Sequence, residues 1–153
     1  SIRRQRQMCI RDRVNVIVSR YAQLCNDNNI NLAVDIRNID FSFITDSDLT
    51  ALLDNLLENA FEAAKSSEKK QIELYIDNRN EKYILFDIIN SSDTEPKTIG
   101  GFYISTKKNK NPHGIGLKSI SRIVKRYSGN LDCNYNNSKK IFQTSILLKT
   151  TSE

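Results

Sequence analysis

The sequence has two asparagines one helical turn apart, Asn55 and Asn59, whose amide oxygens could together bind a ligand. Both lie in the segment Leu49–Ala64, where residues i and i+4 point to the same side of a helix. Two neutral oxygen ligands at this spacing suit a hard cation such as Mg²⁺, with phosphate oxygens and waters completing its shell. The pair therefore indicates a site for a cation and a phosphorylated ligand.

The apolar residues of the same segment recur at helical spacing and form one broad face: Leu49, Leu52, Leu53, Leu56, Leu57, Ala60, Phe61 and Ala64. Asn55, Glu58 and Glu62 fall on the opposite side, and Asn59 lies at the border, where its amide needs partners. An amphipathic helix with a solvated polar face is the alternative interpretation of this pattern.

A second group of candidate residues lies downstream. Gly114 and Gly116 come just before an expected helix, where backbone N–H groups can approach a phosphate and the helix dipole favours negative charge. They follow a run containing Lys107, Lys108 and Lys110, which could neutralise phosphates or could be a solvated charged stretch. A plain loop before a helix is the alternative for the glycines, and a structural role is expected for His113.

Asn-Leu-Leu-Glu-Asn-Ala at 55–60, followed by the lysine-rich stretch and Gly-Ile-Gly-Leu at 114–117, resembles the N box and second glycine box of the GHKL ATP-binding domain. That domain occurs in sensor histidine kinases, gyrase-type topoisomerases, Hsp90-type chaperones and mismatch-repair proteins. The chain most resembles the kinases related to peptide-pheromone and citrate sensors. The resemblance covers roughly Val14 to Leu148.

The resemblance implies ATP and Mg²⁺ as cofactors. It implies that Asn59 and Asn55 bind the metal, and that Asn55 and Glu58 are the catalytic candidates. Some family members have His or Glu at the position of Asn55; Asn cannot take a proton, which favours phosphoryl transfer over hydrolysis. The remaining implied nucleotide-binding residues are Asn90, Lys107, Lys108, Gly114, Ile115, Gly116 and Leu117.

The first glycine box departs from the family pattern, which is Asp-x-Gly-x-Gly after a strand, with the Asp accepting from the adenine amino group. Here the expected strand leads into Asn90-Ser91-Ser92-Asp93, without a glycine. An Asn side-chain carbonyl can still accept that hydrogen bond. Asp93 is the substitute if the register differs.

Apolar periodicity predicts the helices and strands that carry these residues. Helices are expected at Val14–Asn28, from Asp46 or Ser47 as N-cap to about Lys65, and from Leu117 to Tyr127 with Gly129 as a left-handed cap. Strands are expected at Asn31–Ile36, at Gln71–Asp77 and Lys82–Asn90 joined by residues 78–81, and at Leu131–Tyr135 and Ile141–Leu148. Ser91–Pro112 is expected to be a long lid.

Strands that come in hairpins imply a mainly antiparallel sheet, and three helices are enough to cover one of its faces. The fold class is therefore expected to be α/β (α+β): a two-layer sandwich with a mixed, mostly antiparallel sheet, helices on one face and a long ATP lid. One domain is expected over residues 14–153. Residues 1–13 are set apart, as a translated sequencing adaptor or the remnant of a dimerisation helix.

Composition agrees with a soluble globular domain, since 39% of the residues are hydrophobic and 27% are charged. Three widely spaced cysteines indicate neither a disulfide framework nor a zinc site, and a cytosolic location fits. Residues 1–13 hold five arginines against Asp12, which accounts for four of the five net positive charges. The rest of the chain is nearly neutral, so a nucleic-acid partner is not expected.

The leading functional interpretation is the catalytic domain of a sensor histidine kinase, without membrane contact of its own. Its expected partners are a His-containing dimerisation domain of the same kinase and a response regulator. An anti-sigma-factor-type serine kinase and a non-catalytic ATP-dependent switch remain as alternatives.

Overall fold

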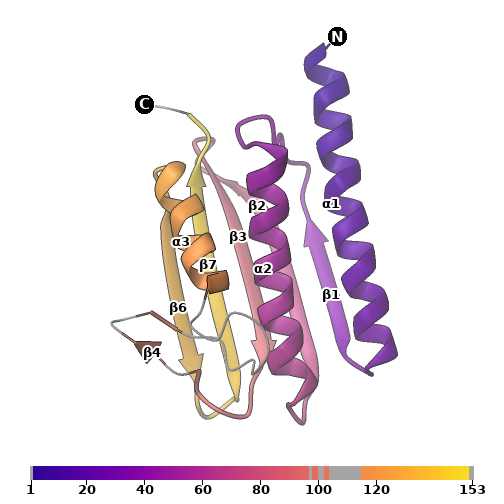
Figure 1. Ribbon diagram of the computed structural model, residues 1–153, viewed down its shortest axis with the longest axis vertical. Helices are drawn as coiled ribbons and strands as arrows, with labels where there is room; N and C mark the ends of the chain where they lie inside the picture. Colours follow the sequence, from indigo (N-terminus) through magenta and orange to yellow (C-terminus); the bar gives the residue numbers. More distant parts are fainter. Residues whose placement is uncertain (1, 97, 100–101, 104–114, 152–153) are drawn as a thin grey trace.

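The computed structural model has two layers, with three helices packed on one face of a sheet (Figure 1). It describes residues 2–96, 98–99, 102–103 and 115–151. The sheet has five strands in the order β1-β2-β3-β7-β6, in which β1 is parallel to β2 and the other pairs are antiparallel. The predicted two-layer, mixed and mostly antiparallel architecture is therefore confirmed.

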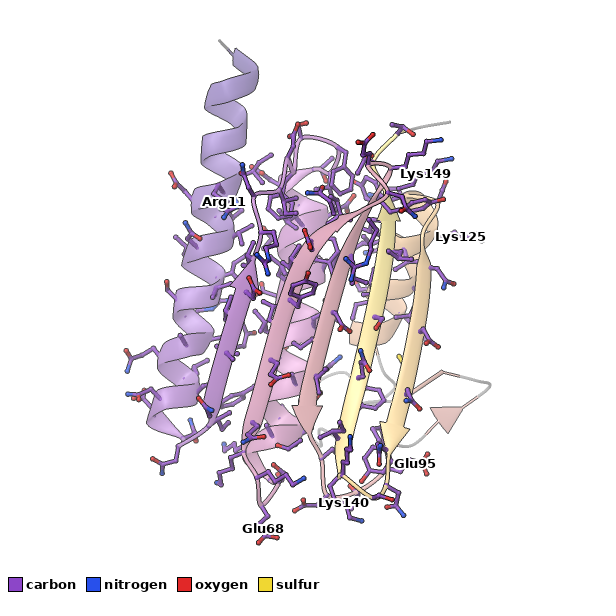
Figure 2. The ribbon with its side chains drawn as sticks, turned by 180° about the vertical axis from the view of Figure 1, so that it is seen from behind. Arg11, Glu68, Glu95, Lys125, Lys140 and Lys149 are labelled. Carbon is purple, nitrogen blue, oxygen red and sulfur yellow. The ribbon has the colours of Figure 1, made fainter. Side chains whose placement is uncertain are left out.

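The helices are α1 (Ile2–Asp27), α2 (Asp46–Lys65) and α3 (Ile115–Arg126). The sheet is formed by β1 (Asn31–Ile36), β2 (Gln71–Arg79), β3 (Tyr83–Ser91), β6 (Asn130–Asn136) and β7 (Ile141–Lys149). Figure 2 shows the opposite face, where the strands lie in front of the helices. Within the described residues, only one face of the sheet is covered by helices.

The central helix α2 matches the prediction from its periodicity. All eight residues of its predicted apolar face are buried in the core against the sheet. Burial of these side chains is the main force that holds the helix in place, at about 25 cal/mol per Å² of apolar surface. The helix ends at Lys65 with Ser66 as its C-cap, as expected.

Three predicted boundaries were wrong. The N-cap of α2 is Thr45, whose hydroxyl accepts from the backbone N–H of Asp48, and not Asp46 or Ser47. Helix α1 begins at Ile2, well before Val14. Ile10 is 1% exposed and extends the apolar stripe of Val14 by one helical turn toward the N-terminus. The β2–β3 turn is later than expected because Arg79 still pairs with Tyr83.

The left-handed residue at the end of α3 is Ser128, with φ of 49°, and not Gly129. The N–H of Ser128 donates to Lys125 O, and that of Gly129 donates to Val124 O at 2.8 Å, which is the Schellman pattern. Gly129 is needed for a different reason: a Cβ there would lie 2.0 Å from the carbonyl oxygen of Leu147. The glycine therefore lets the end of α3 approach β7 closely.

The expected lid, Ser91–Pro112, lies largely outside the described residues. Two short strands within it, β4 (Thr98–Ile99) and β5 (Phe102–Tyr103), pair antiparallel to each other. Among the described helices, none has the length and apolar character required to cross a bilayer.

Candidate functional site

Asn55 and Asn59 lie on the side of α2 that faces α3. This direction is marked by Asp48, whose carboxylate accepts hydrogen bonds from Arg126 and Tyr127 at the end of α3. Asn55 follows Asp48 by about two helical turns and Asn59 by about three, so all three side chains share one stripe of the helix. The structure therefore brings the two predicted asparagines together on the α3 side.

The first turn of α3 lies level with Asn59. The two helices run antiparallel, and Asp48 of α2 is opposite Arg126 of α3 (Figure 1). From this contact, Asn59 is about 17 Å along α2, and Ile115 is about 17 Å along α3 in the same direction, at 1.5 Å per residue. Because the first N–H groups of a helix have no intrahelical acceptor, those of Ile115, Gly116 and Leu117 can donate to a ligand beside Asn59.

The side chain of Asn59 is available to a ligand. It is half-buried, and within the described residues its amide makes no hydrogen bond. The Nδ2 of Asn55 donates to the backbone oxygen of Ala51 at 2.7 Å, which orients its Oδ1 as an acceptor. Two amide oxygens one turn apart can serve as neutral ligands of Mg²⁺.

The described residues of the site offer few ligands to a cation that is not bound to a nucleotide. Among the residues that the structure describes, no group of three or more His, Cys, Asp or Glu side chains could hold a metal ion. The two asparagine oxygens would have to share the ion with phosphate oxygens and waters, which is the usual arrangement for Mg²⁺ bound with a nucleotide. The two amide oxygens therefore fit a cation that binds together with the phosphates of a nucleotide.

Glu58, the other catalytic candidate, projects about 100° away from Asn59 around the helix axis. Its negative charge acts instead on Tyr21 of α1, whose pKa is raised by burial and then by the charges of Asp54 and Glu58. The structure places Glu58 away from the stripe that faces α3, so it supports no contact between Glu58 and a ligand beside Asn59.

Asn90 lies at the end of β3 and faces the helices. It is 4% exposed, and alternation along the strand places it on the side of the buried Phe86 and Ile88. Its Nδ2 donates to Ser91 O at 3.1 Å, and within the described residues its Oδ1 accepts no hydrogen bond. Asn90 therefore offers an acceptor beneath the helical layer, as an adenine amino group requires.

A polar network fixes the strand end that carries Asn90. The Ser91 hydroxyl lies 2.6 Å from that of Ser67, just after α2, and accepts from the N–H of Gln71 at 3.0 Å. The N–H of Ser92 donates to Lys140 O, at the end of the sheet where Glu68, Glu95 and Lys140 are labelled in Figure 2.

Asp93, the alternative to Asn90, has a different role. It is exposed, and its carboxylate accepts from the backbone N–H of Glu68 at 3.0 Å. The contact ties the end of β3 to the segment after α2. Of the two residues, Asn90 is therefore the one that faces the helical layer.

Thr144 of β7 is a candidate that the sequence analysis missed. It is buried and faces the helices beside Ile88, two residues from Asn90 on the neighbouring strand. The signal was present in the sequence, because Thr144 replaces an apolar residue on the alternating face that continues with Ile146 and Leu148. A buried hydroxyl at this position adds a polar group next to Asn90.

The other predicted ligands are only partly placed. Lys107, Lys108, Lys110, His113 and Gly114 lie outside the described residues. Gly116 was expected before the helix and instead belongs to its first turn, because α3 begins at Ile115. Helix ends vary by one or two residues between assignments, so this shift leaves the N–H groups in place.

Comparison with known proteins gives a family and a fold. The sequence model of the GHKL domain family matches residues 44–149, more than half of the chain. No curated protein matches the chain in a sequence comparison.

The similar solved structures include a nucleotide-free catalytic domain of the histidine kinase ThkA, with 16% identity, a TM-score of 0.69 and 94% of each chain covered. The mycobacterial sensor histidine kinase MprB is 15% identical with a TM-score of 0.68, and the match covers 90% of this chain and 93% of that one. Full-length ShkA in complex with AMPPNP is 13% identical with a TM-score of 0.63, over 88% of this chain and 29% of that one. These likenesses show a shared fold.

Proposed function

This chain belongs to the GHKL domain family, and we propose that it is the ATP-binding catalytic domain of a two-component sensor histidine kinase. In this role it binds Mg-ATP and presents the γ-phosphoryl group to a histidine on a separate helical domain. The observation that carries the proposal is the half-buried Asn59, whose amide has no partner within the described residues and lies level with the first turn of α3.

Each residue has a defined role. Asn59 and Asn55 supply oxygen ligands to the cation, and the Oδ1 of Asn90 accepts from the adenine amino group. Mg²⁺, when bound, neutralises part of the phosphate charge. The backbone N–H groups of the first turn of α3 hold the phosphates, together with Gly114, Lys107 and Lys108.

These residues position the nucleotide and neutralise its phosphate charge, and none of them takes a proton from a nucleophile. Phosphoryl transfer requires little covalent chemistry from the protein, since alignment and charge stabilisation supply most of the rate enhancement. Asn55 cannot act as a base toward water, so the site favours transfer to a positioned acceptor over hydrolysis. The acceptor is a His-containing dimerisation domain of the same kinase, and a response regulator on the cytosolic side receives the phosphoryl group.

Two substitutions of Asn90 test the assignment of the adenine acceptor. Asn90→Leu keeps the approximate shape but removes the acceptor, so its ATP affinity should fall about tenfold or more. Asn90→Asp retains an acceptor oxygen and should bind ATP within about threefold of the wild type. Calorimetry with Mg-ATP and Mg-GTP measures both effects.

Circular dichroism of both Asn90 variants serves as the folding control, because Asn90 is buried. A folded Asn90→Leu variant that binds ATP as tightly as the wild type would remove Asn90 from the adenine site. Equal affinity of the wild type for ATP and GTP would count against adenine recognition altogether.

A further inference from the structure

A polar cluster holds the end of α3 that lies farthest from the candidate site. Nη1 of Arg126 donates to both carboxylate oxygens of Asp48, at 3.0 and 2.9 Å, and the Tyr127 hydroxyl donates to Oδ2 at 2.7 Å. Asp48 is 8% exposed, whereas more than half of the Arg126 side chain is exposed. Burial raises the pKa of Asp48, but the hydrogen bonds from Tyr127 and Arg126 together hold it below its usual value. The carboxylate is therefore charged at neutral pH.

The same cluster completes the N-terminal cap of α2. The Thr45 hydroxyl accepts from the N–H of Asp48, and the N–H of Thr45 donates to the Tyr127 hydroxyl at 3.1 Å. In a capping box the acid three residues after the cap would accept that N–H directly. Here the Tyr127 hydroxyl bridges the N–H of Thr45 and the carboxylate of Asp48. The start of α2 and the end of α3 therefore form one hydrogen-bonded unit.

Hydrogen bonds of this kind are directional, so they can fix the position of α3 along its axis, which apolar packing leaves adjustable. Among the α3 residues whose side chains the structure describes, those buried in the core are Ile120, Ile123 and Val124. Their hydrophobic contacts are non-directional, so they resist separation of the helices more than small sliding along the axis. The hydrogen bonds to Asp48 require narrow distances and angles, and charge-assisted bonds are the stronger kind. The cluster thus adds a directional restraint on the height of α3 on α2, beside the backbone bond from the N–H of Lys149 to Tyr127 O.

We infer that Asp48, Arg126 and Tyr127 are positioning residues for the phosphates of the nucleotide, and that they act through α3 from its far end. The inference rests on the proposed function. A slide of α3 by one residue is about 1.5 Å, which takes a first-turn N–H out of hydrogen-bonding distance of a phosphate oxygen held at Asn59. The adenine site at Asn90 is on β3 and does not move with α3.

The test compares a ligand that has phosphates with one that lacks them. Asp48→Asn should bind Mg-ATP about tenfold more weakly than the wild type, as distant positioning contacts can do. Its affinity for adenosine should stay unchanged, because adenosine does not reach the first turn of α3. NMR titrations well below the unfolding temperature measure both affinities, including millimolar ones.

Asp54→Asn is the matched control. Asp54 lies on the same helix but pairs with Arg20 of α1, so its loss should leave both affinities unchanged. Arg126→Gln is the second variant, since its side chain is exposed and the substitution leaves the buried carboxylate in place. It should lower the affinity for ATP about threefold or more and leave the affinity for adenosine unchanged. This variant decides the test if Asp48→Asn fails to fold.

Three results would overturn the inference. ATP affinities at the wild-type level in folded Asp48→Asn or in Arg126→Gln would show that the cluster only joins two helices. Equal losses for ATP and adenosine would show general loosening of the domain. A wild-type domain that fails to bind ATP would refute the proposed function together with the inference, and is recognised without any variant.

Discussion

Asn59→Ala is expected to lower the affinity for Mg-ATP by about 100-fold while the domain remains folded. A hydrogen bond or ligand contact to a charged group contributes about 1.5–3 kcal/mol, and the cation would lose one of its two protein ligands. The free energy of unfolding should change by no more than about 0.5 kcal/mol, because the side chain is half-buried and has no partner within the described residues.

Calorimetry for binding and urea denaturation for stability measure these two quantities. Asp54→Ala on the same helix is the control, because Asp54 faces Arg20 of α1 and not α3. Asn55→Ala should have a smaller effect on affinity together with a cost in stability, since its amide donates to Ala51 O. If Asn59→Ala binds Mg-ATP as tightly as the wild type, the assignment of the site is wrong.

The second large effect concerns the phosphoryl acceptor. We expect the chain alone to form no acid-labile phosphoprotein with labelled ATP, because transfer requires an in-line nucleophile within about 3–3.5 Å of the γ-phosphorus. His113 is the only histidine in the sequence, and it directly precedes Gly114 in the segment proposed to hold the phosphates. A residue tied to the phosphate cradle has little freedom to reach the opposite side of the γ-phosphate.

Addition of a helical domain that carries the acceptor histidine should raise labelling well above background, since it supplies the in-line nucleophile that the transfer requires. His113→Ala should leave that labelling largely intact, and Asn59→Ala should remove it. Strong self-labelling that disappears in His113→Ala would contradict both the proposed acceptor and the proposed role of the loop.

Periodicity predicted the parts of the fold that depend on burial. The face of α2 from Leu49 to Ala64 is apolar at every helical repeat, so its orientation on the sheet followed from the sequence. The alternation in 83–90 predicted a strand, but both of its faces carry apolar residues, so the face of Asn90 became clear only from the structure. Of the predicted site residues, Asn59 could therefore be assigned to the border of the apolar face before the structure.

Features that depend on long-range partners could not be predicted in this way. The cap at Thr45 is favoured because Tyr127, far along the chain, occupies its N–H. Ser128 takes the left-handed position because Gly129 is needed where Leu147 O approaches. The direction of Asn59 toward α3 also required Asp48 and its partners, which no local pattern reveals.

An NMR titration of the labelled wild-type domain with Mg-AMPPNP shows whether the nucleotide binds at the proposed site. We expect the largest shift changes at the side-chain amide of Asn59, the backbone amide of Gly116 and the side chain of Asn90, with smaller changes when Mg²⁺ is omitted. Residues on the opposite face of the sheet, such as Glu73 and Gln143, should not respond. If Asn59, Gly116 and Asn90 show no saturable changes, or if the changes are confined to that opposite face, the nucleotide does not bind at the proposed site.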